Sequence, residues 1–428
     1  MVDVVCCELS GQYKDNLVQE IHSWAGCTRS TRGFTANFYM GNFIPSDEHS
    51  HNVLALVSGD SHHFTAVNRQ LHERFAPKSE FDDQRNLGQS MVDAVFAGLR
   101  DEQLDTFINA ATSVLATGTR VRTLFAGPPL VARTFLDRGR RELVLEHLTR
   151  LLLEGKRRGA DSAVLGAYTK VDGLDAELAR LNILPIATGN RFTAYIQAQH
   201  ILRVCQMHQW NPAETPVAIV GACGSVGRGL AMVLRKYCPL ILVGRTESHL
   251  CGLADSLAER GSHAVSIAYG PAALTGVLPR ARILIFLTKG FRFEVDDMPP
   301  NLHIIDAARP HATRNRLRQI LGSQWRNWLD DGGLVDIRGL HLEPELFHLP
   351  GQVMLPCLSE RLALTALGFT SHFGIEPEIF PWLTGIDDYI DRLESELVFV
   401  ARGAALAGIG LSESRAYHNT HSPYELMS

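Results

Sequence analysis

Short apolar blocks alternate with longer amphipathic blocks from about residue 120 onward. The apolar runs in VAIV (217–220), in ARILIFLTKG (281–290) and in LHIIDAARP (302–310) are short and continuous, as expected for strands buried on both faces. RRELVLEHLTRLLLEG (140–155) instead has helical spacing, with one apolar face formed by Val144, Leu148, Leu151 and Leu152. The alternation predicts an α/β protein in which helices cover mixed or parallel sheets.

The first 115 residues have a less regular pattern. GFTANFYMGNF and HNVLALVSGD are typical of strands, and DAVFAGLRDEQLDTFINAATSVLA (93–116) is typical of a helix. Histidine is frequent here, at His49, His51, His62 and His63. These imidazoles are possible metal ligands, but their spacing does not place neighbours on one helix face and no cysteine pattern accompanies them. Solvated loops are therefore the simpler interpretation, and we assign no metal.

Three glycines follow the apolar run Val217–Val220 at regular spacing, in VAIVGACGSVGRGL. Gly221 suits the sharp turn from strand to helix, Gly224 allows a diphosphate to approach the backbone, and Gly227 permits close packing of helix on strand. Ser225 and Val226 would begin the helix, whose free amides and dipole attract an anion. A glycine pattern framed by strand and helix predicts dinucleotide binding, with a structural glycine turn as the alternative.

The next strand, in PLILVGRTESHL, indicates which dinucleotide binds. NAD sites usually have a carboxylate at the end of this strand, whereas this chain has Arg245 and Thr246. A guanidinium suits the extra 2′-phosphate, so we predict NADPH, and an ordinary surface arginine is the alternative. The ends of the later strands should also face the cofactor, at Leu287, Thr288, Lys289 and Asp306. Of these, Lys289 and Asp306 are expected near the nicotinamide ribose.

Cys357 follows a proline in GQVMLPCLSERLALTALG (351–368). Proline is favoured at the first helical position, and the leucines after it keep helical spacing. The thiol then lies in the first turn, where amides and dipole stabilise a thiolate. The alternative is a small buried core residue.

Composition narrows the class of protein further. The chain has 428 residues, a formal net charge of −5 and eight dispersed cysteines. This balance argues against a nucleic-acid partner, and the cysteines indicate a reducing compartment rather than a disulfide framework. We find neither a signal-peptide pattern nor an apolar run long enough for a membrane span. We expect a cytoplasmic protein without stable membrane insertion.

Three ordered stretches, IATGNRFTAYIQAQ, VAIVGACGSVGRGL and GQVMLPCLSERLALTAL, resemble the cyanobacterial long-chain fatty acyl-carrier-protein reductases, which form aldehydes. The resemblance covers about residues 115–410. It implies that Cys357 takes the acyl group from a thioester and that NADPH reduces it. The sequence departs from the family at Ser225, where an aspartate is usual, and at DAARP, where DGGYP is usual.

The resemblance also implies partners and auxiliary residues. The acyl donor would be an acyl carrier protein or a coenzyme A thioester, and an aldehyde-consuming enzyme would follow. Thr188, Asn190 and Thr193 are candidate oxyanion donors, and simple helix capping is the alternative for Thr188 and Asn190. The segment Arg133–Arg158 holds eight basic residues against four acidic ones. It is our candidate surface for an acidic carrier protein, although such runs are usually a solvated face.

Together these features predict four segments. They are an N-terminal extension of unclear fold (1–115), an α/β substrate domain (116–208), a Rossmann-type doubly wound parallel sheet that binds NADP (209–345) and a C-terminal helical segment packed on the substrate domain (346–428). The C-terminal segment includes an amphipathic helix in TGIDDYIDRLESELVFVARG. Two other functions remain open: an oxidoreductase of the shikimate dehydrogenase or glutamyl-tRNA reductase kind acting on a small substrate, and a non-catalytic NADP-binding sensor.

Overall fold

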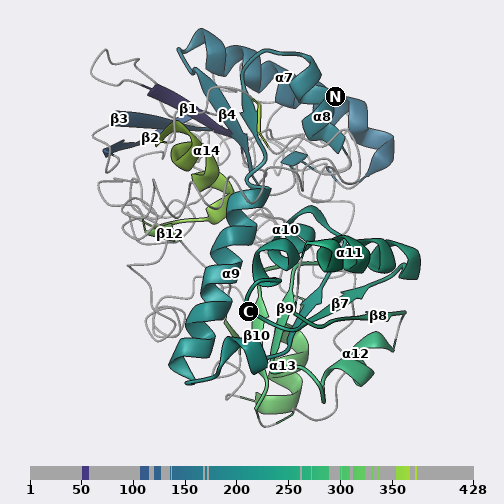
Figure 1. The fold of residues 1–428 in the computed structure, drawn as a ribbon. Coiled ribbons are helices and arrows are strands. Elements are labelled where there is room, and N and C mark those ends of the chain that lie inside the picture. The colour runs from purple at the N-terminus through teal and green to yellow at the C-terminus, as the bar shows by residue number, and fades with distance from the viewer. Residues whose placement is uncertain are drawn as a thin grey trace, which may run out of the picture.

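The computed structural model describes residues 51–56, 107–114, 120–126 and, with gaps, 135–373. They form two α/β units, each built on its own sheet (Figure 1). The helix α9 (Asn190–Met207) connects the last strand of the first sheet to the first strand of the second. Within these residues no helix is both long and apolar enough to cross a membrane.

The first sheet has the strand order β2-β3-β1-β4-β5. Its strands are β1 (His51–Leu56), β2 (Phe107–Val114), β3 (Arg120–Ala126), β4 (Ser162–Leu165) and β5 (Ile186–Ala187). All neighbours pair in parallel except β2, which runs antiparallel to β3. One face packs under α7 (Arg141–Arg157) and α8 (Leu174–Arg180), and the other under α14 (Pro356–Ala366). Alternate residues divide between the two cores: Leu54 lies on the α7 side and Val53 on the α14 side.

This sheet corrects two predictions about the first 115 residues. The segment Phe107–Val114, predicted as part of a helix, is the strand β2, because it pairs along its whole length with β3. β1, predicted as a strand, is confirmed and lies between β3 and β4. Both strands lie in the same sheet as β3, β4 and β5, so the predicted boundary at residue 115 falls inside the first α/β unit. GFTANFYMGNF, His49, His62 and His63 lie outside the described residues, and His51 begins β1.

The second sheet is parallel throughout and has the order β11-β10-β9-β6-β7-β8. Its strands are β6 (Val217–Val220), β7 (Leu240–Gly244), β8 (Val265–Tyr269), β9 (Ile283–Phe286), β10 (His303–Asp306) and β11 (Leu329–Asp330). The order reverses at β6, between β7 and β9, which confirms the predicted doubly wound sheet.

Helices cover both faces of this second sheet. α9, α10 (Ser225–Leu234) and α11 (Glu247–Glu259) share one core with Ile219 and Leu242. α12 (Ala273–Val277) and α13 (Arg314–Leu321) share the other with Val220 and Phe286. Neighbouring residues of each strand therefore face opposite cores, and both faces are apolar.

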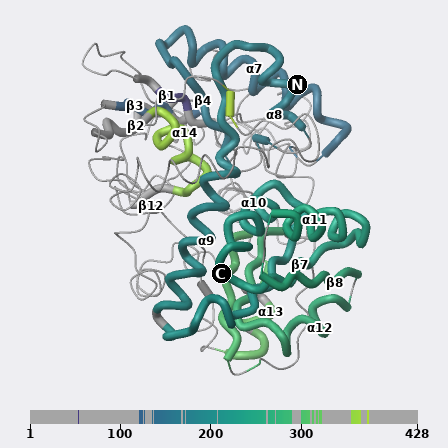
Figure 2. The backbone as a smooth tube through the Cα atoms, in the orientation of Figure 1, coloured from purple at the N-terminus to yellow at the C-terminus, as the bar shows by residue number. Residues whose placement is uncertain are grey.

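α9 sets the relation between the two sheets. It starts directly after β5, at the carboxyl edge of the first sheet, packs along α10 and ends before β6 (Figure 2). Because a helix of 18 residues is about 27 Å long, it spans the second sheet from edge to edge. The first turn of α9 thus lies where the carboxyl edges of both sheets meet.

The C-terminal region returns to the first sheet, as predicted for the residues that are described. A short antiparallel pair, β12 (Val335–Asp336) and β13 (Val353–Met354), leads into α14, which packs on β4, β1 and α9. After α14 the Phe373 amide donates a 2.8 Å hydrogen bond to the Ile186 carbonyl and covers the β5 edge. The predicted helix in TGIDDYIDRLESELVFVARG lies outside the described residues.

Candidate functional site

The glycine loop after β6 requires glycine at two of its three glycine positions, Gly221 and Gly227. Gly221 has a φ of 90°, and a Cβ there would lie 2.8 Å from Cγ2 of Thr288. A Cβ on Gly227 would collide with the backbone of Gly221 and Ala222. Gly224 precedes the first residue of α10 and is exposed, and it offers no side chain that could cap the helix. The loop is therefore a cradle that side chains would fill, next to an uncapped helix N-terminus.

The other predicted cofactor residues lie on both sides of this loop. Arg245 and Thr246 follow β7 and are exposed, while Leu287 and Thr288 follow β9. Since β7 and β9 both pair with β6, these four residues share the carboxyl edge at which the strand order reverses. Ser225 and Val226, the first residues of α10, are partly accessible beside it. Lys289 lies outside the described residues.

Asp306 has a different role from the one we predicted. It ends β10 and is fully buried. One carboxylate oxygen accepts hydrogen bonds from the amide and hydroxyl of Thr313, at 2.8 and 2.7 Å, and the other accepts from the Ala308 amide at 3.2 Å. The carboxylate thus holds the turn that leads into α13, which favours a structural role over a ribose contact.

Cys357 is the second residue of α14 and is partly buried, as the proline–cysteine pattern predicted. Its backbone lies against Gly189, which has a φ of 73° and precedes α9. A Cβ on Gly189 would approach the Cα of Cys357 to 2.6 Å and its carbonyl carbon to 2.7 Å. The first turns of α14 and α9 therefore meet at the carboxyl edge of the first sheet.

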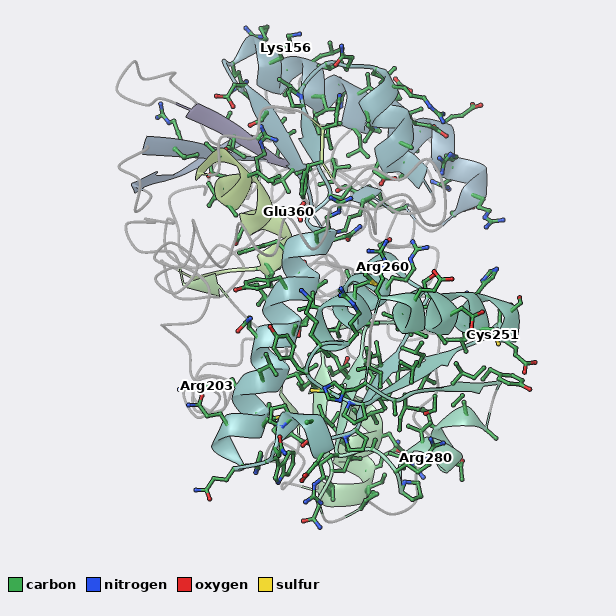
Figure 3. The ribbon with its side chains drawn as sticks, in the orientation of Figure 1. Lys156, Arg203, Cys251, Arg260, Arg280 and Glu360 are labelled. Carbon is green, nitrogen blue, oxygen red and sulfur yellow. The ribbon has the colours of Figure 1, made fainter. Side chains whose placement is uncertain are left out.

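Glu360, which the sequence did not single out, joins these two helices. Its carboxylate is fully buried and accepts hydrogen bonds from the amides of Gly189 and Phe192, at 2.6 and 2.8 Å. It therefore caps α9 from α14, the task considered for Thr188 and Asn190. Figure 3 shows Glu360 where the two helices come together. Burial raises the pKa of Glu360, and the two backbone hydrogen bonds and the charges of Lys170 and Arg191 oppose that rise.

The predicted oxyanion donors differ in burial and in the hydrogen bonds that they already make. The Thr193 hydroxyl donates to the Gly189 carbonyl at 2.6 Å, so that proton is used within its own helix. Thr188 is fully buried, and its carbonyl accepts a hydrogen bond from Lys170. Asn190, the first residue of α9, is partly accessible. Asn190 is therefore the member of this set best placed to donate to a ligand beside Cys357. The Leu358 and Ser359 amides of α14 already donate to the Leu355 carbonyl, at 3.0 and 3.2 Å.

Lys170 is the second residue that the sequence did not indicate. It follows β4 in a turn that Thr169 closes by donating its hydroxyl to the Gly166 carbonyl at 2.7 Å. Its ammonium donates to the Thr188 carbonyl at 2.5 Å. Burial lowers the pKa of Lys170, while negative charge on Cys357, Glu360 and Asp175 opposes the fall. Lys170 thus lies near Cys357 within the first unit.

We expect Glu360→Ala to lower the free energy of unfolding by about 1–3 kcal/mol, because two buried amides lose their acceptor. Glu360→Gln should lose less, since its carbonyl oxygen still accepts one of the two bonds. Urea denaturation measures both losses. Glu177→Ala is the matched control, because its ion pair with Arg141 is about one third exposed and should contribute less than about 1 kcal/mol. Equal losses at the two positions would contradict the capping role.

Several basic residues of the segment 133–158 form ion pairs with nearby acidic side chains. Arg157 and Arg158 pair with Glu154, at 2.5 and 2.6 Å, and Arg141 pairs with Glu177 at 2.6 Å. α7 runs back from the carboxyl edge to the amino edge of its sheet, so Lys156 lies far from Glu360 (Figure 3). Only the beginning of α7 is on the side of Cys357. Arg133 lies outside the described residues.

Comparison with known proteins gives limited matches. No known family model matches the chain. The aminotransferase PigE of Serratia sp. (strain ATCC 39006) is 30% identical over 138 residues, which are 32% of this chain and 16% of that protein. The chain therefore spans only a small part of the curated relative that it matches, and the whole relative's activity does not transfer.

Solved structures with a similar arrangement include several oxidoreductases. Shikimate dehydrogenase in complex with NADP+ aligns with 82% of this chain and 99% of its own, at 14% identity and a TM-score of 0.34. Quinate dehydrogenase from Corynebacterium glutamicum in complex with NAD aligns with 65% of this chain and 93% of its own, at 14% identity and a TM-score of 0.31. Similarity at this level carries no argument about activity or cofactor. The acyl-carrier-protein reductase resemblance stays a prediction.

Proposed function

We propose that this protein is an NADPH-dependent oxidoreductase that converts an acyl thioester into an aldehyde through a covalent thioester on Cys357. One observation carries the proposal: Cys357 lies in the first turn of α14, against Gly189, at the carboxyl edge where the two sheets meet. A core cysteine would serve equally well deeper in α14, whereas a nucleophile needs this accessible end and the positive end of the helix dipole.

The chain's own residues support the two halves of such a reaction. The Cys357 thiolate would attack the carbonyl carbon, and the bond to the carrier sulfur would break. The carrier thiolate would leave and take a proton from solvent. One thioester replaces another, so the step gains mainly by fixing the acyl group in place. The Cys357 amide and the Asn190 side chain would donate to the oxyanion, because the next two amides of α14 already donate to the Leu355 carbonyl.

The glycine loop fits a nicotinamide dinucleotide. Gly221, Gly224 and Gly227 would hold the diphosphate against the first amides of α10, and Thr288 would border the nicotinamide end. A bound NADPH would supply the hydride that reduces the acyl carbon. The oxyanion left on that carbon then collapses, breaks the bond to the Cys357 sulfur and releases the aldehyde. The thiolate is restored without any further proton.

We expect Arg245→Ala to weaken NADPH binding by about 1–3 kcal/mol, the usual size for a charge-assisted contact, and to leave NADH binding almost unchanged. Arg245 is exposed at the carboxyl end of β7. The nearby Glu247 carboxylate accepts a hydrogen bond from the Tyr269 hydroxyl. Fluorescence titration of both cofactors measures the change. Arg203→Ala, at an exposed position on α9, is the control. An equal loss for both cofactors would show that Arg245 does not read the 2′-phosphate.

The direct test of the proposal is covalent acylation. Carrier-protein and coenzyme A thioesters from short to long, with polar members included, are incubated with the protein without NADPH. Intact-mass analysis should show one acyl adduct per chain. For a long-chain site, acylation efficiency should rise with chain length, because each buried methylene contributes about 0.8 kcal/mol. A complete absence of adducts would overturn the thioester proposal.

For the acyl donor we propose an acyl carrier protein that docks on the carboxyl side of the first unit. Arg138 and Arg140 are exposed just before α7, on that side of the sheet, while the basic residues at the far end of α7 are too distant. An acidic carrier would meet this end by charge complementarity. Aldehyde as the product implies that an aldehyde-consuming enzyme follows.

A second candidate is a dehydrogenase that acts on a small hydroxy acid without a covalent step. The observation in its favour is the neighbouring pair Lys170 and Asp175, which could exchange protons with a substrate hydroxyl. That enzyme would keep its activity in Cys357→Ala. A protein that binds NADPH but turns over neither class of substrate would instead fit the sensor hypothesis.

A further inference from the structure

Lys170 is a lysine of the candidate site whose hydrogen-bond partner, Thr188, lies next to the residue that contacts Cys357. Its ammonium donates to the Thr188 carbonyl at 2.5 Å. The next residue, Gly189, lies against the Cys357 backbone. The turn that carries Lys170 is fixed by two hydrogen bonds from Thr169 to the Gly166 carbonyl, through its amide and its hydroxyl. The turn at Thr169 and the hydrogen bond to Thr188 therefore both fix the position of the Lys170 side chain.

We propose that Lys170 is the fixed positive charge of the thioester site, which stabilises the Cys357 thiolate and then the oxyanions formed from it. This inference rests on the proposed function for the oxyanions, whereas the pairing of ammonium and thiolate stands without it.

The charge balance of the reaction explains why a fixed cation suits it. The resting thiolate, the tetrahedral oxyanion, the leaving carrier thiolate and the hemithioacetal oxyanion each carry one negative charge. Each step moves that charge between sulfur and oxygen, and none requires a proton from the protein. A positive charge near Cys357 would stabilise every stage, and the carrier thiolate takes its proton from solvent.

The groups around Lys170 leave it free for this role. Cys357, Glu360 and Asp175 face it from α14 and α8, and Arg191 lies near Glu360 on α9. Glu360 uses both carboxylate oxygens on the backbone of α9, so it is committed to the helix cap. Asp175 is buried at the start of α8, and burial raises its pKa. Among the neighbours of Lys170, Cys357 is then the one whose negative charge the reaction requires.

The test is the pH profile of Cys357 alkylation by iodoacetamide, followed on the peptide that contains Cys357. Loss of an adjacent opposite charge should move the midpoint up by about 1–3 pH units in Lys170→Gln. Lys170→Arg, which keeps the charge, should stay close to wild type. Lys156→Gln, an exposed lysine at the far end of α7, should not move it. An unchanged midpoint in Lys170→Gln would overturn the proposal.

A second measurement separates this inference from the proposed function. The rate of acyl-adduct formation should fall about 100-fold in Lys170→Gln, as for loss of an oxyanion donor. If wild type forms the adduct and Lys170→Gln forms it equally fast, Lys170 has no such role and the proposed function stands. If the alkylation midpoint moves but no thioester acylates wild type, the pairing is supported and the proposed function is wrong.

The variant is expected to fold. Because burial lowers the folded-state pKa of Lys170 below its ordinary value of 10.5, the stability linked to this group is present above that value and lost as the pH falls through the folded-state pKa. Burial of the protonated amine therefore lowers the stability of the protein at pH values below 10.5. Lys170→Gln should melt no lower than wild type at neutral pH, and its advantage should shrink as the pH approaches 10.5. A cooperative melt confirms that lost reactivity is not unfolding.

Discussion

Cys357→Ala is expected to abolish the acyl adduct and to lower aldehyde formation by at least about a thousandfold. The alanine keeps the helix but removes the sulfur that would carry the acyl group. Intact-mass analysis with a thioester and without NADPH detects the adduct, and NADPH oxidation measures turnover. NADPH binding should be unchanged, because the glycine loop belongs to the other sheet.

Cys251→Ala is the matched control, since Cys251 is an exposed free cysteine on α11. It should retain both the adduct and the activity. If Cys357→Ala still forms aldehyde at the normal rate, the covalent mechanism is wrong and the second candidate, direct reduction of a carbonyl, gains support.

Gly189→Ala is expected to disable the site while leaving the cysteine in the chain. Gly189 has a φ of 73°, and its new Cβ would lie 2.6 Å from the Cα of Cys357. Backbone strain and this collision together should cost about 2–4 kcal/mol in the free energy of unfolding. The start of α14 must move away from α9, so acylation should fall by at least about 100-fold.

Gly270→Ala separates the two causes. Gly270 also has a positive φ, 83°, but a Cβ there would meet nothing within 4 Å. This control therefore reports backbone strain alone. Denaturation and acylation are measured for both variants, with NADPH binding as a check on the second sheet. A loss in Gly189→Ala no greater than that in Gly270→Ala would show that the contact with Cys357 does not matter.

The sequence determined the elements whose signals are local. Short apolar runs predict the strands of the second sheet, and three glycines within seven positions predict its glycine loop. Both patterns can be recognised within one strand–turn–helix unit. The same holds for α7 and for the start of α14 at the proline before Cys357. In each case the residues that make the pattern also make the structure, and no distant partner is needed.

Pairing between distant segments required the tertiary structure. Phe107–Val114 has a pattern compatible with a helix, and only the β3 edge turns it into a strand. Pairing with β3 also places β1 and β2 in the first α/β unit instead of a separate extension. Asp306 lies at the predicted strand end, but its carboxylate accepts a hydrogen bond from the amide of Thr313, seven residues later.

The site divides in the same way. Cys357 and the glycines could be recognised because a nucleophile and a diphosphate loop impose their own neighbours in sequence. Lys170 and Glu360 could not, because a lysine after a strand and a glutamate in a helix are unremarkable until folding brings them to Gly189. Their roles depend on burial and on partners from other elements, since a charge gains its effect only where water is excluded and a specific atom receives it.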